Sequence, residues 1–217
     1  MTGPGATECA ITELRTAGAP SAGTAGRSLS AVQAAKDPGR VVTAARDFLT
    51  ELGVDLTRDG MADTPARMAR AYAELFTARP FTATTFANDA DYDELVIARR
   101  IPVVSVCEHH LLPFTGTATV GYLPSRRLLG LSKLARLVEH FARRPQVQER
   151  LTRQIAHWLT EELAPRGVGV LIHAEHTCMT LRGAQAVGSS TVTSTLLGLL
   201  RQDPAARAEF FTLAGMQ

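Results

Sequence analysis

Two pairs of strand-like segments flank a pair of amphipathic helices in this sequence, and that order most constrains the fold. The strand-like segments, rich in β-branched residues, are 94–106, 115–123, 168–178 and a stretch near 190–195. Between the pairs, helical spacing of apolar residues predicts helices from Ser132, the expected N-cap, to about Phe141 and from about Val147 to Leu163. Strand pairs on both sides of a helix pair favour an α+β fold, with helices on one face of an antiparallel sheet.

Two more helices are expected ahead of this unit. One begins at Asp37-Pro38 and stops at Gly53, and the other begins at Thr64-Pro65, where Thr64 is a suitable N-cap. Residues 78–91 have the composition of a loop, and a short helix is expected from Pro204.

The first 37 residues are rich in Ala, Gly, Ser and Thr and have almost no large apolar side chains. Such a segment cannot bury enough surface to offset its ordering entropy, so a disordered tail is predicted over 1–37, with Cys9 as an incidental thiol. An organellar presequence is the alternative, which Glu8 and Glu13 disfavour. The remainder forms one expected domain, 38–217, with N-terminal helices over 38–90 and the α+β part over 91–217.

Composition excludes several classes of function. Of the 217 residues, 45% are apolar, which is enough for a real core. No apolar run reaches the roughly 18 residues of a membrane helix, and residues 1–20 do not resemble a secretory signal, so we expect a cytoplasmic protein without membrane contact. A formal net charge of +2 without a basic stripe gives no reason to expect nucleic-acid binding.

The densest chemistry lies in Cys107-Glu108-His109-His110 and, far downstream, in His176-Thr177-Cys178. An odd count of three cysteines argues against disulfides and favours metal or nucleophile roles. Cys107 and His110 have the spacing at which a turn presents two ligands to one ion, and Cys178 can supply a third. Strand alternation over 168–178 places His176 on the same face as Cys178.

Three protein ligands leave the fourth position of a tetrahedral zinc ion open for water, as in catalytic sites. His109 and His176 are then acid/base candidates, because imidazole titrates near neutral pH. The alternative is that the Cys-x-x-His pair is accidental and the cysteines are small buried residues; the two clusters together favour the metal. The histidines at 140, 157 and 173 are interpreted as surface or internally satisfied residues.

A second set of residues is basic and polar. Ser132, Lys133 and Arg136 lie in the first turns of a predicted helix, where phosphate oxygens can be received. Arg182 and Arg67 could add to this set. Glu149 beside Gln148 can accept hydrogen bonds from the donor edge of a purine such as guanine. These signals are weak by themselves, and Arg143 and Arg144 are interpreted as part of a solvated helix face.

These residues together resemble the GTP cyclohydrolase I family. The resemblance covers about residues 40–213. It rests on Asp63-Thr64-Pro65-x-Arg67, Cys107-Glu108-His109-His110, Pro113-Phe114-x-Gly116, Gly121-Tyr122-Leu123-Pro124, Gly130-Leu131-Ser132-Lys133-Leu134-Ala135-Arg136, Gln146-Val147-Gln148-Glu149-Arg150-Leu151, His176-x-Cys178-Met179 with Arg182-Gly183, and Thr191-Val192-Thr193-Ser194. It implies the tunnelling fold, in which sheets of several subunits close into a barrel, usually in a homodecamer. It also implies conversion of GTP and water to 7,8-dihydroneopterin triphosphate and formate, the entry step of pterin and folate biosynthesis.

The resemblance implies a role for each site residue. The ligands of one Zn²⁺ per subunit would be Cys107, His110 and Cys178, and the residues that move protons would be His109 and His176. The expected substrate contacts are Glu149 with Gln148 at guanine, Ser132 near the ribose, and Lys133, Arg136, Arg182 and Arg67 at the triphosphate, with Arg67 reaching from a neighbouring subunit. Thr117, Ala186 and Ser190 stand where many relatives carry basic residues, which leaves the metal and proton-transfer positions intact.

Three other functions are less well supported. A zinc deaminase would carry His-x-Glu together with Pro-Cys-x-x-Cys, and the chain lacks that combination. A structural zinc or nucleic-acid-binding module would need a fourth protein ligand and a basic stripe. A pterin-binding relative without turnover is disfavoured because the full residue set is present.

Overall fold

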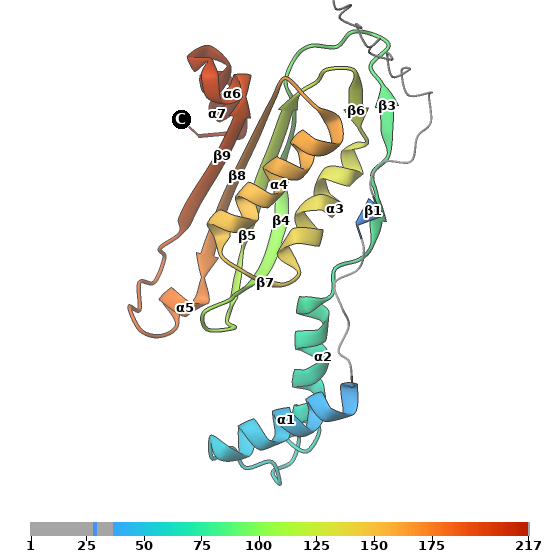
Figure 1. The fold of residues 1–217 in the computed structure, drawn as a ribbon. Helices are drawn as coiled ribbons and strands as arrows, with labels where there is room; N and C mark the ends of the chain where they lie inside the picture. Colours follow the sequence, from blue (N-terminus) through green and yellow to red (C-terminus); the bar gives the residue numbers. More distant parts are fainter. Residues whose placement is uncertain (1–27, 30–36, 217) are drawn as a thin grey trace, which may run out of the picture.

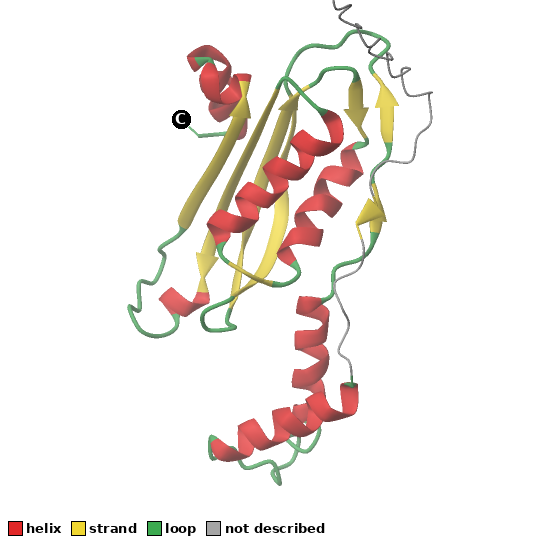
Figure 2. Ribbon diagram, viewed as in Figure 1, coloured by secondary structure: helices red, strands yellow, loops and turns green. Residues whose placement is uncertain are grey.

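A five-stranded sheet organises the main part of the chain (Figures 1 and 2). The computed structural model describes residues 28–29 and 37–216. The predicted tail, with Cys9, therefore lies outside the described residues, apart from Asp37 and the two-residue strand β1 (Ser28–Leu29). That strand pairs antiparallel with β2 (Phe81–Thr82).

The sheet has the order β7-β4-β5-β8-β9. Its four long strands are β4 (Val96–Cys107), β5 (Pro113–Leu123), β8 (Gly167–His176) and β9 (Thr191–Gly198). Each pairs antiparallel with its neighbour, whereas β7 (Pro145–Gln146) pairs parallel with the end of β4. The four predicted strands are thus confirmed, and the antiparallel sheet with them.

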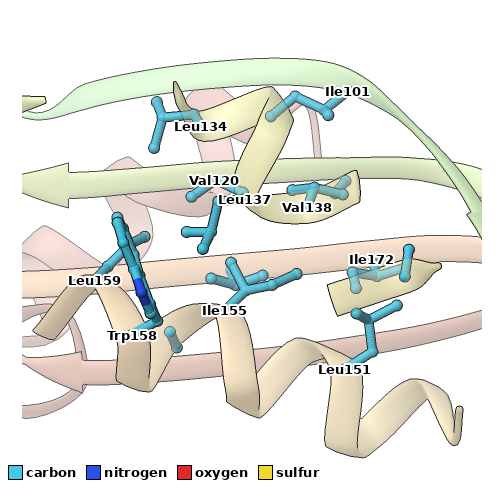
Figure 3. Close-up of a cluster of buried hydrophobic side chains, with 14 of the residues drawn as sticks. Ile101, Val120, Leu134, Leu137, Val138, Leu151, Ile155, Trp158, Leu159 and Ile172 are labelled. Atoms are coloured by element: carbon cyan, nitrogen blue, oxygen red, sulfur yellow. The ribbon is translucent and has the colours of Figure 1, made fainter. Parts of the chain in front are cut away.

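Helices α3 (Leu131–Ala142) and α4 (Gln148–Leu163) cover one face of this sheet (Figure 1). Figure 3 shows the core between them: Leu134, Leu137 and Val138 of α3 and Leu151, Ile155, Trp158 and Leu159 of α4 face Ile101, Val120 and Ile172 of the strands. Burial of this apolar stripe is what holds the two helices on the sheet, as the spacing of three and four predicts.

A second apolar cluster lies on the face of the sheet opposite α3 and α4. It joins Leu95, Leu123, Leu171 and Leu196 of the strand region to α6 (Leu199–Gln202) and α7 (Pro204–Ala214), where Leu200 and Phe210 are buried. The helix expected from Pro204 is confirmed, and Asp203 caps it by accepting a 2.9 Å hydrogen bond from Ala205 N. Leu95, just before β4, and Leu123, the last residue of β5, thereby pack in the same cluster as the C-terminal helices.

The first two helices, α1 (Pro38–Glu51) and α2 (Thr64–Phe76), pack on each other and project from the end of the sheet (Figure 1). The predicted start of α1 is confirmed: Asp37 Oδ1 accepts hydrogen bonds from the backbone N of Gly39 and Arg40. The N-cap of α2 is Asp63, one residue before the predicted Thr64, because Thr64 already has helical geometry. Within the described residues, none of the helices combines the length and the apolar character that a membrane span requires.

Three further local predictions were wrong. Residues 78–91 are not all loop, since β3 (Thr85–Ala87) pairs with β6 (Arg127–Leu129) in a ladder too short to leave a period in the sequence. Helix α3 begins at Leu131 after the N-cap Gly130, not after Ser132. The strand expected over 168–178 ends at His176, and α5 (Thr177–Thr180), a single helical turn, follows it.

Candidate metal centre and active site

The two chemistry-bearing motifs meet at the end of the sheet where β4 turns into β5 and β8 runs into α5 (Figure 1). The turn after β4 is closed by backbone hydrogen bonds from Leu111 N to Cys107 O and from Cys107 N to Leu112 O. Leu111 adopts a left-handed conformation (φ 54°), which lets the chain reverse direction within five residues. This turn leaves the side chains of Glu108, His109 and His110 exposed.

Cys107, His110 and Cys178 form a group that could hold a metal ion. One ligand atom from each residue lies within 4.8 Å of the other two. Cys107 Sγ lies 3.8 Å from His110 Nδ1 and 3.6 Å from His109 Nδ1. Cys178 reaches the group from α5 and not from a strand face, so the alternation argument that placed it beside His176 was wrong although the group it predicted is present.

The donor set suits zinc. Two thiols and one imidazole are ligands that zinc prefers, and three protein ligands are the number found in catalytic zinc sites. In the chain alone, burial and the neighbouring Cys107 thiol raise the pKa of Cys178. A bound cation removes this effect because it stabilises the thiolate form of a coordinating cysteine.

The turn that carries the ligands is braced against α4. Arg150 forms an ion pair with Glu108, and this hydrogen bond lowers the pKa of the Glu108 carboxyl. The same guanidinium donates from Nε to Gln146 Oε1 at 3.0 Å. Gln146 in turn pairs with Cys107 in the sheet. Glu108 therefore has a structural role here: its ion pair with Arg150 connects the ligand-bearing turn to α4.

His176 occupies the last position of β8, next to the metal-capable group. Its ring stacks on Phe114, its cross-strand partner, with centroids 4.4 Å apart and planes inclined by 12°. Its Nε2 lies 2.7 Å from Gln148 Oε1. Burial lowers the pKa of His176, and the charge of nearby Glu149 opposes that shift. A neutral imidazole is therefore favoured, which is the state in which a ring can accept a proton.

The structure does not bring the predicted phosphate contacts on α3 to this group. The end of α3 near the site is Ala142, whose carbonyl accepts a 2.7 Å hydrogen bond from Ser105 Oγ on β4. Ala142 comes ten positions after Ser132 in the helix, so the two lie about 15 Å apart at 1.5 Å per residue. Lys133 and Arg136 share that helix, with Lys133 in its first turn beside Gly130.

The two remaining arginines lie on different parts of the chain, Arg67 in α2 and Arg182 after α5. Arg182 follows α5 and is close enough to Cys178 for its charge to lower the pKa of that thiol, against the larger effect of burial. Arg67 lies on the projecting helix α2, where its guanidinium hydrogen-bonds Gly60 O and Thr64 Oγ1. Farther along the same helix, Tyr72 OH donates to Leu111 O of the ligand-bearing turn at 3.2 Å.

One histidine was misjudged from the sequence. His157 and His173 have the polar partners expected of them, but His140 is 5% exposed and its Nδ1 has no hydrogen-bond partner among the described residues. It packs edge-on against Phe81 and Phe141. Burial, with a smaller effect of Arg144, lowers its pKa from 6.5 to about 4. The signal was available, because position 140 continues the apolar stripe of α3 three residues after Leu137.

Sequence reasoning also missed how enclosed several polar residues are. Arg144 is half-buried and donates from Nη2 to His140 O at 2.9 Å, so it is not part of a solvated face. Gln148 is only 2% exposed, although it was expected to contact guanine. Phe114, which is fully buried, was recognised only as part of a motif. Burial of a glutamine at the start of a helix leaves no pattern that a single sequence reveals.

Comparison with known proteins gives consistent matches. The family model described as GTP cyclohydrolase I matches residues 41–215. A curated GTP cyclohydrolase 1 from Thermobifida fusca is 50% identical over 182 residues, which cover 82% of this chain and 88% of the relative. One from Mycobacteroides abscessus is 50% identical over 182 residues, covering 82% of this chain and 89% of the relative. One from Rattus norvegicus is 52% identical over 170 residues, covering 76% of this chain and 70% of the relative.

Proposed function

This chain belongs to the GTP cyclohydrolase I family and converts GTP and water to 7,8-dihydroneopterin triphosphate and formate, and on that basis we propose that Cys107, His110 and Cys178 hold one catalytic zinc ion per subunit. The observation that carries this proposal is the approach of the three ligand atoms to within 4.8 Å, from two segments about seventy residues apart in the sequence. The reaction is a hydrolysis of cyclic amidine C–N bonds and the entry step of pterin and folate biosynthesis.

The metal ion and the side chains around it have different proposed roles in the reaction. When bound in a three-ligand site, zinc lowers the pKa of water at its open position and so supplies a nucleophile for opening the imidazole ring of guanine. His109 and His176 flank the site and are the groups proposed to move protons at the purine and at the ribose. Glu149, exposed on the first turn of α4 beside His176, is the proposed guanine anchor.

We also propose that the active site is completed between subunits of a homodecamer with the tunnelling-fold barrel of its family. The separation of about 15 Å along α3 supports this, because Ser132 and Lys133 lie at the far end of that helix from the metal ligands. A neighbouring copy that presents the start of its α3 would supply the ribose and triphosphate contacts of Ser132, Lys133 and Arg136. Arg67, on the projecting helix α2, and Arg182 would complete the triphosphate site.

Two organisational proposals accompany this function. Residues 38–217 form one catalytic domain, consistent with a family match over 41–215. A cytoplasmic location suits a site whose two cysteine ligands must stay reduced, because cytosolic thiols are kept reduced.

The function is tested with purified, zinc-loaded protein and GTP. Formate and a pterin that becomes fluorescent after oxidation are expected, and the absence of both with metal bound would refute the enzymatic activity. Cys178→Ser is expected to lose metal and turnover together, whereas His109→Ala should keep metal and lose turnover. If His109→Ala also loses the metal, the ligand assignment is wrong.

Sharing of the site between subunits has its own test. Cys178→Ser removes a metal ligand and Lys133→Met removes a triphosphate contact, so each variant alone is expected to be inactive. Mixed oligomers formed by co-expression should recover part of the activity, because some sites combine the intact half of each chain. Failure of the mixture to recover activity, with mixed oligomers demonstrated by native mass spectrometry, would show that each site is built within one chain.

A further inference from the structure

Gln148 is a buried polar residue that touches a proton-carrying candidate. It is the first residue of α4 and is 2% exposed. Its Nε2 lies 3.0 Å from Ile172 O, 3.0 Å from Thr191 O and 3.1 Å from Thr193 Oγ1, and its Oε1 lies 2.7 Å from His176 Nε2. Both polar atoms of the side chain are therefore occupied inside the chain.

These contacts determine which way the amide faces. Two of the three atoms around the Gln148 nitrogen are backbone carbonyl oxygens, which can only accept hydrogen bonds. An amide rotated by 180° would place its own oxygen against both carbonyl oxygens, so that acceptors would face acceptors. The nitrogen must therefore face β8 and β9, and the oxygen must face His176.

The threonines beside Gln148 support the same orientation. Thr152 Oγ1 donates to Gln148 O at 2.7 Å and lies 2.6 Å from Thr193 Oγ1. Since the Thr152 hydrogen is used on the carbonyl, the Thr193 hydroxyl must donate to Thr152 and is left as an acceptor for the Gln148 amide. The two hydrogens of the Gln148 amide are thus shared among three acceptors, and among the described residues His176 is the partner of Oε1.

An amide oxygen is an acceptor, so the imidazole nitrogen 2.7 Å away must carry a hydrogen. Neutral imidazole has one N–H and one lone pair, and a hydrogen at Nε2 leaves the lone pair on Nδ1. The stacked Phe114 ring limits rotation of the imidazole out of this arrangement. The partner of one ring nitrogen thus decides what the other nitrogen can do.

We propose that Gln148 is a positioning residue that holds His176 in its Nε2–H tautomer and so reserves Nδ1 as the atom that accepts a proton. This inference rests on the proposed role of His176 in proton transfer. It replaces side-chain contact with guanine as the function of Gln148, because the residue is 2% exposed and both polar atoms of its side chain have partners among the described residues. Glu149, the next residue, keeps the guanine contact.

The tautomer is measured directly by neutron diffraction from deuterated crystals of the zinc-loaded protein above neutral pH. Deuterium on His176 Nε2 and none on Nδ1 is the expected result. Deuterium on Nδ1, alone or together with Nε2, would overturn the proposal. This measurement needs no turnover, so it stands apart from any failure of the proposed enzymatic activity.

Kinetics of Gln148→Met distinguish positioning from substrate contact. Methionine fills the volume of glutamine but accepts no strong hydrogen bond. We therefore expect kcat to fall about 10- to 100-fold, which is no more than the smallest loss typical of removing a proton-transfer group itself. KM should change by less than about threefold, because ground-state binding is untouched. A raised KM with unchanged kcat would show that Gln148 binds substrate and would overturn the proposal.

A matched control lies on the same helix. Gln154 is half-buried and accepts a 2.8 Å hydrogen bond from Gln146 Nε2, without contacting His176. Gln154→Met should leave kcat within about twofold of the wild type, and both variants should keep their metal content. If Gln154→Met lowers kcat as much as Gln148→Met does, the effect is a general loss of packing and the proposal fails; if Gln148→Met does not fold, the neutron measurement on the wild type still decides.

Discussion

Acidification is expected to destabilise the folded chain through His140. This histidine is buried against Phe81 and Phe141, and its Nδ1 lacks a partner in the part of the chain that the structure describes; its pKa is lowered from 6.5 to about 4. The causes are burial first and then the charge of Arg144, with Glu139 opposing them. Protonation in the folded state therefore places an unsolvated charge in the core next to another cation.

The sign and size of the effect follow from proton linkage. Between pH 6.5 and about 4 the unfolded chain binds a proton at His140 that the folded chain does not, so stability is full above pH 6.5 and is lost as the pH falls toward 4. A difference of about 2.5 pKa units corresponds to at most about 3.4 kcal/mol, of which about 2 kcal/mol is lost by pH 5. Below pH 4 this contribution changes no further.

Urea unfolding at about pH 7.5 and about pH 5 measures this loss, with enzyme concentration held constant. His140→Leu removes the titrating group, so its free energy of unfolding should fall about 2 kcal/mol less between the two pH values than that of the wild type. His157→Leu, at an exposed position on α4, is the matched control for losing an imidazole. If His140→Leu and the wild type lose the same free energy of unfolding on acidification, the argument from burial is refuted.

Three further changes test how the fold is held together. Ile155→Ala, at the fully buried centre of α4, should lower the free energy of unfolding by about 2–5 kcal/mol in urea titrations, because it leaves a cavity between the helices and the sheet. Gly169→Ala should lower the free energy of unfolding by about 1–3 kcal/mol in the same assay, since its new Cβ would lie 2.6 Å from the buried ring of Phe210. A stability equal to wild type would mean that α7 can shift away from the sheet without loss of stability. Asp37→Ala should destabilise α1 by about 1 kcal/mol through loss of its N-cap, seen as faster amide exchange at Gly39 and Arg40 with no change in kcat.

The parts of the site that were predictable from the sequence are local in the chain. Cys107 and His110 are three residues apart, so one turn brings them together whatever the rest of the fold does. Cys178 was predicted to be the third ligand because a thiol can bind zinc, and not because the sequence showed where it lies. Its predicted strand position was wrong, because β8 ends at His176 and α5 carries the thiol to the same group.

Buried polar residues show the opposite case. Gln148 and His140 were read by their side-chain chemistry as a substrate contact and as a surface or satisfied residue. Their burial depends on which side of α4 and α3 meets the sheet and on which strand lies there, and no property of one residue reports that. The hydrogen bond between Gln148 and His176 joins residues that are far apart in the chain, so only the packing of α4 on β8 creates it.

The sequence by itself determined the types and the order of the main elements and the identity of the metal-capable group. Periods of two and of three to four residues record which face of each element is buried, and Cys-x-x-His is a spacing that a single turn satisfies. Only the tertiary structure decided that Gln148 faces His176. It also decided that the C-terminal end of α3 lies near the metal-capable group, so that the start of this helix is about 15 Å away from that end. Both depend on how rigid elements pack against one another, and packing is set by contacts between residues that the one-dimensional pattern does not relate.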